Sequence, residues 1–245
     1  MTVASGAPGA AQAAAAEAVD AAEYNSRWHG IWEAGLQPGE MFDIGGVSPA
    51  LSRLLASRDL DLAGRSFLVP GCGRGYDVVA AAAAGAARAV GLDLSGAAVA
   101  AAAAHRDATA GPEAAARAHF VQGDFFTYSD DVVPAFDAGY DYTMLCALHP
   151  SMRPAWAAAW ARLLRPGGHL VTMVYPVDSS LESRPGPPWP VTPGLYKDLL
   201  LPAGFELLSL DPIPDHLSHP RRVGREWLGR WRRAGAAPAA VGGGA

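Results

Sequence analysis

The sequence of 245 residues is poor in cysteine and has no uninterrupted long apolar run, and each scarcity excludes a class of protein. Two cysteines, Cys72 and Cys146, are too few for a disulfide-stabilised secreted fold of this size, so we expect reduced thiols in a cytoplasmic protein. The alanine-rich stretches are interrupted before they reach the roughly eighteen apolar residues of a membrane-spanning helix. We therefore expect no membrane association.

An excess of positive charge is also missing, because the formal net charge is −5. This balance gives the molecule no general attraction to nucleic acids, so we expect no nucleic-acid partner. Half of the residues are hydrophobic and only 18% are charged, which is typical of a globular protein. No long apolar stripe or coiled-coil pattern indicates self-association, and a monomer is expected.

The two ends of the chain have a biased composition. The first 22 residues are rich in Ala and Gly and contain no Lys or Arg, so they resemble neither a secretory signal nor a transit peptide. We expect disordered tails over residues 1–22 and 234–245, and a single domain over residues 23–233.

Between the tails, short apolar runs alternate with helical patterns, which is typical of a parallel sheet covered by helices. Strands are predicted at residues 66–70, 89–93, 119–122, 142–147, 169–175, 205–210 and about 226–231. Upstream, an irregular tryptophan-bearing arm precedes a short helix that starts at Ser48-Pro49. The pattern predicts an α/β fold with a Rossmann-like, doubly wound, mostly parallel sheet of seven strands.

The strongest chemical signal is the segment VPGCGRGYD, which directly follows the first predicted strand. Gly71, Gly73 and Gly75 permit a tight turn and a close approach of the backbone to a ligand. Asp93 ends the next strand, 18 residues beyond Gly75, where a carboxylate can accept hydrogen bonds from two ribose hydroxyls. This combination predicts a site for an adenosine-type cofactor.

The glycine spacing separates two classes of cofactor. Dinucleotide sites favour G-x-G-x-x-G, whereas this chain has G-x-G-x-G followed by Asp77 at a helix N-terminus. A carboxylate there would repel a diphosphate but not the cationic groups of S-adenosylmethionine. The pattern therefore favours the methyl donor S-adenosylmethionine and disfavours a NAD(P)-linked oxidoreductase. Asp124 and Phe125 follow the third strand, where they can frame an adenine ring.

Several motifs in order resemble the thiol and halide methyltransferases of the thiopurine S-methyltransferase-like group. The likeness covers about Arg27 to Arg233 and rests on VPGCGRGYDVV, VGLDLS, GDFF, YDYTMLCALHPSMRPAWA, LLRPGGHLVTMVYP, GPPW and GREWLGRW. The resemblance implies methyl transfer from S-adenosylmethionine to a small soft nucleophile (a halide ion, bisulfide or a thiol) by in-line displacement. A larger thiol or thiopurine-like heterocycle, or a non-catalytic module that binds S-adenosylmethionine, are the alternatives.

The resemblance also assigns roles to individual residues. Trp28 and Trp32 match tryptophans of an N-terminal lid arm, about residues 23–60, that folds over the cofactor and offers cation–π contacts. Some relatives carry a third tryptophan where this chain has Gly39. Tyr142 matches an aromatic residue that borders both cofactor and acceptor, and Tyr175 can point at the acceptor. We expect both tyrosines to be catalytic-site residues.

Three further features have a possible functional interpretation and a purely structural one. Cys146 lacks a recognisable base and is interpreted as a buried apolar cysteine, not a nucleophile. Asp215, His216 and His219 lack further ligands, so no metal site is expected. The arginine-rich segment from His219 to Arg233 is either a solvated face or an electropositive mouth that attracts an anionic acceptor.

Overall fold

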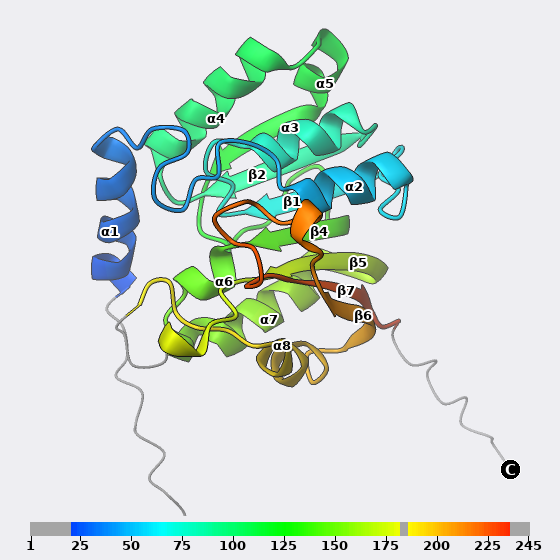
Figure 1. Ribbon diagram of the computed structural model, residues 1–245. Helices are drawn as coiled ribbons and strands as arrows, with labels where there is room; N and C mark the ends of the chain where they lie inside the picture. The colour runs from blue at the N-terminus through cyan, green and yellow to red at the C-terminus, as the bar shows by residue number, and fades with distance from the viewer. Residues whose placement is uncertain (1–20, 182–185, 236–245) are drawn as a thin grey trace, which may run out of the picture.

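The structure is a computed structural model that describes residues 21–181 and 186–235 of the chain. The predicted tails lie almost wholly outside the described residues. Seven strands form one sheet (Figure 1): β1 Ser66–Pro70, β2 Arg88–Asp93, β3 Ala118–Gln122, β4 Phe136–Tyr142, β5 Leu164–Val174, β6 Phe205–Pro212 and β7 Trp227–Arg233. The helices are α1 Ala21–Glu33, α2 Pro49–Ser57, α3 Tyr76–Ala83, α4 Gly96–Thr109, α5 Pro112–Arg117, α6 Met144–Ala147, α7 Arg153–Leu163 and α8 Pro193–Leu200. Short 3₁₀ turns lie at η1 Pro150–Met152, η2 Ser179–Leu181 and η3 Asp215–Leu217.

The sheet has the strand order β3-β2-β1-β4-β5-β7-β6. Strands β1 to β5 pair in parallel, and β7 pairs antiparallel with both β5 and β6. The chain order therefore reverses between β1 and β4, which opens a crevice at the carboxyl ends of these strands. The prediction of a doubly wound, mostly parallel, seven-stranded sheet is confirmed.

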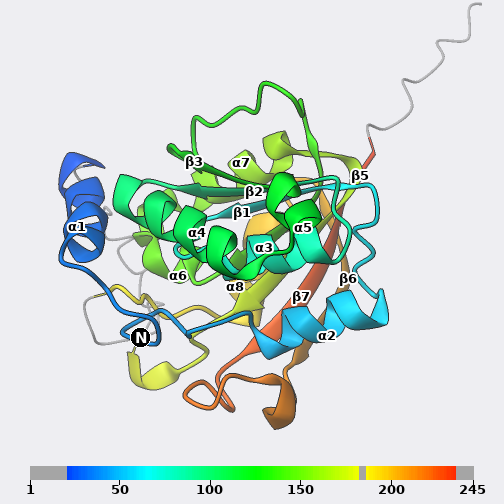
Figure 2. The ribbon, with the colours of Figure 1, turned by 90° about the horizontal axis from the view of Figure 1, so that it is seen from above.

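Both faces of the sheet are covered, and β1 shows why its apolar run is continuous. Phe67 and Val69 pack into a core with α2 and α3, whereas Leu68 points to the other face and the core with α7 and α8. Successive side chains of a strand point to opposite faces, so a strand covered on both sides must be apolar throughout. Figure 2 shows α3, α4 and α5 together on one face of the sheet.

The fourth strand was wrongly placed by the sequence pattern. The apolar run 142–147 was predicted as the strand, but β4 is Phe136–Tyr142 and most of the run forms α6. Thr143, in the left-handed region at φ 70°, ends the strand. The apolar pattern misses β4 because this strand contains Asp141. The Asp141 carboxylate is fully buried and accepts a 2.7 Å hydrogen bond from Trp156 Nε1.

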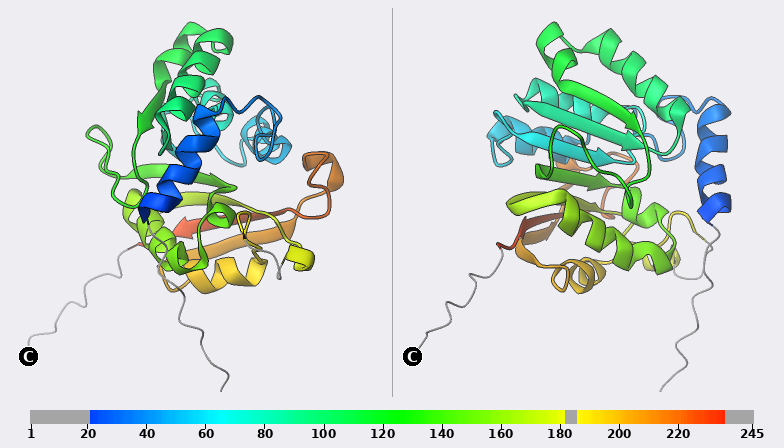
Figure 3. Two further views of the ribbon diagram at one scale, coloured as in Figure 1. Left: turned by 90° about the vertical axis from the view of Figure 1, so that its left-hand side faces the viewer. Right: turned by 180° about the vertical axis from the view of Figure 1, so that it is seen from behind.

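The N-terminal arm is also more regular than predicted. Its tryptophans lie on α1, a helix of 13 residues, and not on irregular chain. The predicted start of α2 is confirmed, because Ser48 Oγ accepts a 3.1 Å hydrogen bond from the Leu51 amide and Pro49 occupies the first turn. In Figure 3 (right) the arrowheads of the parallel strands point toward α1. The arm therefore lies over the end of the sheet where the crevice opens.

Within the described ranges, no helix is long and apolar enough to cross a membrane.

Candidate active site

A cavity of about 680 Å³ lies at the carboxyl ends of the parallel strands, beneath α1. Its wall includes eight of the residues predicted from the sequence: Trp28, Trp32, Gly71, Gly73, Asp93, Asp124, Phe125 and Tyr175. The other two predicted residues, Gly75 and Tyr142, do not line the cavity. The fold thus brings together segments from α1 to the residues before β7 in one cavity.

The glycine loop, residues 71–75, turns back directly after β1. All three of its glycines have positive φ, between 50° and 72°. A Cβ on Gly73 would lie 3.1 Å from the Trp32 ring, so the loop and the arm pack closely. Gly75 has a different role, because a Cβ there would lie 2.4 Å from Phe120. Gly75 therefore lets the loop pack on β3 and does not line the cavity.

Asp93 ends β2 at the floor of the cavity. Its carboxylate is 8% exposed and is held in place by two backbone amides, with Gly73 N 3.0 Å from Oδ2 and Ser95 N 3.0 Å from Oδ1. Burial raises the pKa of Asp93, and these amide donors oppose the rise. A carboxylate has about four acceptor positions, so two remain for ligand hydroxyls.

Beyond β3, Asp124 and Phe125 form the next part of the wall. Asp124 Oδ1 accepts a 2.9 Å hydrogen bond from the Phe126 amide, which fixes the loop. Phe125 is buried against Trp160, with 5.2 Å between the ring centroids. This end of the cavity offers a flat apolar surface beside a carboxylate, which suits a heterocyclic base with an exocyclic amine.

The arm covers the cavity with three aromatic rings, one of which the sequence did not indicate. The Phe42 ring lies 5.7 Å from Trp28 and 6.1 Å from Trp32, both edge-to-face. Phe42 follows Gly39 by three residues in the same turn. Gly39 itself has φ 83°, a conformation that favours glycine.

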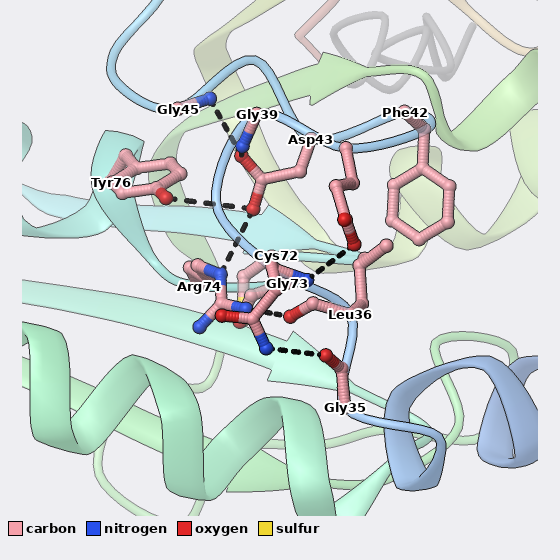
Figure 4. Close-up of polar contacts among 12 residues, drawn as sticks. Gly35, Leu36, Gly39, Phe42, Asp43, Gly45, Cys72, Gly73, Arg74 and Tyr76 are labelled. Carbon is pink, nitrogen blue, oxygen red and sulfur yellow. Dashed lines mark hydrogen bonds and ion pairs between the residues drawn. The ribbon is translucent and has the colours of Figure 1, made fainter.

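The arm turn, residues 39–43, is fastened to the glycine loop through Asp43 (Figure 4). Asp43 accepts hydrogen bonds from the Gly39 and Gly45 amides, at 3.2 and 2.6 Å, and from Arg74 Nε at 3.1 Å. Arg74 also donates to the Leu36 carbonyl, and its guanidinium lies 5.5 Å from the Trp32 ring. This side of the arm turn is thus held by the same loop that lines the cavity.

The opposite side of the arm turn is held by the C-terminal loop, residues 213–226. Arg221 Nη2 donates to the Gly39 and Asp43 carbonyls, at 2.8 and 3.0 Å, and Arg222 Nη2 donates to the Phe42 carbonyl at 2.8 Å. The arginine-rich segment is therefore not simply a solvated face. Its first residues fix the arm across the cavity.

Arg222 is the most unusual member of the wall. It is only 4% exposed, and its guanidinium lies 4.7 Å from the Tyr142 ring and 4.4 Å from the Tyr175 ring. Its Nη1 is buried and has no hydrogen-bond partner within the described part of the chain. Because Arg222 lines the cavity, its buried positive charge makes this part of the wall attractive to an anionic ligand.

The ring of Tyr142 lies against Arg222, whereas its hydroxyl is directed to Glu226. The hydroxyl donates to Glu226 Oε1, and Ser218 Oγ donates to Glu226 Oε2. Burial raises the pKa of Tyr142 well above its usual range; Glu226 adds to the rise and Arg222 opposes it. Tyr142 therefore stays a neutral phenol, and its hydroxyl is not available to a ligand in the cavity.

The remaining wall on this side is apolar and rich in sulfur. It comprises Met144, Cys146, Leu148, Met152, Pro187 and Pro188. Burial raises the pKa of the Cys146 thiol to about 12, and the thiol lies 3.2 Å from the Thr143 carbonyl oxygen. Because only a thiolate is a strong nucleophile, Cys146 is part of the wall and not a reacting group.

Asp77, which entered the argument about cofactor class, lies behind the wall. Burial raises its pKa to about 7, while the Ser48 amide and Arg222 lower it. Because Asp77 does not line the cavity, it does not select a ligand there by direct repulsion. The choice between cofactor classes rests instead on the relatives of the chain.

Comparison with known proteins gives a consistent picture. A family model described as thiopurine S-methyltransferase matches residues 23–230. The chain is 39% identical over 207 residues to a probable thiol methyltransferase of Arabidopsis thaliana and 40% identical over 207 residues to a thiocyanate methyltransferase of Brassica oleracea, and each match covers 84% of both chains. A thiopurine S-methyltransferase of Shewanella amazonensis is 30% identical over 215 residues, or 82% of this chain and 93% of the other.

Solved structures support the fold alone. The magnesium protoporphyrin IX methyltransferase of Synechocystis PCC 6803 superposes with a TM-score of 0.64 at 18% identity, over 87% of this chain and 97% of that chain. The two proteins therefore share their overall fold.

Proposed function

We propose, from the premise that the chain belongs to the thiopurine S-methyltransferase family, that this S-adenosylmethionine-dependent methyltransferase acts on a small soft anion held at Arg222. The acceptors that fit are a thiolate, bisulfide, thiocyanate or a halide ion. Membership of a family of enzymes sets aside the non-catalytic alternative.

The residues of the cavity fit S-adenosylmethionine. Asp93 keeps two acceptor positions for the ribose hydroxyls, and Asp124 with Phe125 can frame the adenine. Trp28 and Trp32 lie in the opposite wall, where an aromatic face can attract a sulfonium by about 0.5–2 kcal/mol. Tyr142 does not reach this ligand directly, so its proposed contribution is to the acceptor side.

The observation that carries the proposal is the buried guanidinium of Arg222, which lines the cavity. Its Nη2 donates to the Phe42 carbonyl, and no ion pair within the described residues neutralises its charge. The rings of Tyr142 and Tyr175 flank it, so its positive charge favours an anion in the cavity. Tyr175, which lines the cavity, is the one of the two predicted tyrosines that can also contact the acceptor.

The reaction needs little acid–base help from the chain. When bound, the cofactor supplies a methyl group that is already activated on a sulfonium. The acceptor's sulfur or halide forms a bond to the methyl carbon while the carbon–sulfonium bond breaks, and that bonding pair stays on the departing sulfur. An anionic acceptor does not have to lose a proton before it attacks, so the residues have to hold it in line and exclude water.

A headspace assay tests the proposal. Purified protein receives S-adenosylmethionine with either iodide or bisulfide, and volatile methyl iodide or methanethiol is measured together with S-adenosylhomocysteine. Both products should form, and R222Q should raise KM for iodide about 10- to 100-fold, because the positive charge that attracts the anion is lost. Turnover that does not respond to R222Q would remove Arg222 from the acceptor site.

A larger thiol or thiopurine-like heterocycle is the second candidate. The apolar wall formed by Met144, Leu148, Met152 and the two prolines favours it, because an inorganic anion does not need such a surface. The relative from Shewanella amazonensis bears the name of such an enzyme. An aromatic thiol added to the assay separates the candidates by kcat/KM.

A further inference from the structure

Arg222 and Glu226 are both buried in the C-terminal loop, at 4% and 2% exposure, yet no ion pair joins them. They lie on two sides of one phenol: Arg222 is over the Tyr142 ring face, and Glu226 accepts from the Tyr142 hydroxyl. A buried guanidinium and carboxylate so placed would normally pair, because each is costly to bury alone. The question is what keeps them apart.

The carboxylate of Glu226 is already satisfied by two hydroxyls. Tyr142 donates to Oε1 and Ser218 donates to Oε2, so each oxygen has a donor that is not Arg222. The Glu226 backbone is fixed as well, since its carbonyl accepts a 3.0 Å hydrogen bond from the Ile213 amide. Both hydroxyl donors come from buried or half-buried residues. Glu226 therefore has no unmet need for a donor.

We propose that Tyr142 and Ser218 are positioning residues that saturate Glu226 and so keep the Arg222 guanidinium unpaired, with its positive charge available to an anionic acceptor in the cavity. The inference rests on the proposed acceptor site at Arg222 and adds to it a role for the Tyr142 hydroxyl. Loss of that hydroxyl leaves a buried carboxylate oxygen without a donor. The oxygen then pairs with the Arg222 guanidinium and competes with the acceptor as an internal anion.

The proposal predicts that E226Q reverses the effect of Y142F on KM for iodide. A purely structural role of Tyr142 predicts no such reversal. Y142F should raise KM for iodide about 10- to 100-fold while kcat at saturating iodide stays within about threefold, because the competitor is displaced at high acceptor concentration. E226Q alone should keep KM within about threefold of the native value or lower it. The double variant Y142F/E226Q should return to the KM of E226Q, since the neutral amide competes poorly for a guanidinium.

Removal of the Ser218 hydroxyl, the second donor to Glu226, should also raise KM for iodide. S218A removes the donor to Oε2 and should raise KM for iodide in the same direction, and E226Q should again reverse it. Thermal unfolding and calorimetric binding of S-adenosylhomocysteine accompany each variant. Unchanged S-adenosylhomocysteine affinity shows that the donor half of the cavity is intact, so a change in KM reports the acceptor half.

The chain provides a matched control at Tyr128. Its hydroxyl donates to Asp130 at 2.8 Å, and Asp130 also pairs with Arg88 at 2.9 Å, but none of the three lines the cavity. Y128F should leave KM for iodide unchanged.

Three results would overturn the inference. If Y142F raises KM and Y142F/E226Q remains equally impaired, Glu226 is not the competitor. If Y142F leaves KM unchanged while R222Q raises it, the acceptor site stands and the positioning role fails. If neither R222Q nor Y142F affects KM for any anion, the proposed function fails with it.

Discussion

Asp43 and Arg74 form an ion pair, with 3.1 Å between Oδ2 and Nε, that joins the N-terminal arm to the glycine loop. The Asp43 side chain is only 3% exposed and also accepts from two backbone amides of the arm. One carboxylate thus shapes the arm turn and fastens it to the glycine loop that lines the cavity.

Replacement of this carboxylate should loosen the arm. D43N is expected to weaken S-adenosylhomocysteine binding about tenfold, because a charge-assisted hydrogen bond contributes about 1.5–3 kcal/mol and part of that holds the arm closed. Titration calorimetry measures the change. D130N, which breaks the equally buried Arg88–Asp130 pair away from the cavity, should lower stability without weakening binding. Equal effects of both variants on binding would contradict the assignment.

Gly75 should tolerate no side chain. In G75A the new Cβ meets Phe120 at 2.4 Å, and φ of 72° is unfavourable for alanine, so unfolding free energy should fall by about 1–3 kcal/mol. Urea unfolding measures it. G194A is the matched control, because Gly194 lies exposed within α8 and alanine there should raise stability by about 0.5–1 kcal/mol. A neutral G75A would show that Phe120 moves aside freely.

Replacement of Thr143 by glycine should raise stability and lower activity. A β-branched residue at φ 70° is strained by roughly 1–2 kcal/mol, and Thr143 lines the cavity. T143G is expected to raise unfolding free energy by about 1 kcal/mol while kcat/KM falls, as the turn after β4 becomes less fixed. R58G relieves a similar conformation at the end of α2, away from the cavity, and should raise stability with activity unchanged. A gain in both properties for T143G would refute a role for the strain.

The buried carboxyl of Asp77 predicts a pH dependence. Because its pKa is raised to about 7, the folded state holds this proton more tightly than the unfolded state, and the resulting stability is lost as pH rises through about 7. D77N, which resembles the protonated form, should be about 1–3 kcal/mol more stable than the native protein at pH 8, and the difference should shrink as pH falls and be nearly zero at about pH 3.5, below the unfolded pKa of Asp. Urea unfolding at both pH values tests this. A less stable D77N at pH 8 would show that the charged form is favoured.

Local features of the fold and site could be predicted from the sequence, because their determinants are adjacent in the chain. The glycine loop, Asp93 and the start of α2 each depend on a few neighbouring residues with restricted backbone geometry. β4 was misplaced because its polar member Asp141 is satisfied by Trp156, which lies 15 residues further on. A hydropathy pattern cannot show that such a carboxylate is buried and paired.

The acceptor half of the site was less predictable for the same reason. Arg222 belongs to an arginine-rich segment whose ordinary interpretation is a solvated surface, and its partner Phe42 is 180 residues away. The resemblance associated Tyr142 with the acceptor region, and this stays a prediction; the direction of its hydroxyl depends on Glu226, 84 residues further along. Contacts of this range are set by the fold, and no local spacing encodes them.

The hydrogen bonds that hold the arm turn, from the glycine loop and from the C-terminal loop, have a consequence for the catalytic cycle. Arg74 holds it from the half of the cavity where the cofactor is expected, and Arg221 and Arg222 hold it from the half where the acceptor is expected. If the arm has to open for release, the spent cofactor and the methylated product depend on the same hydrogen bonds. Variants that weaken either side of the arm turn should then change the rate of product release.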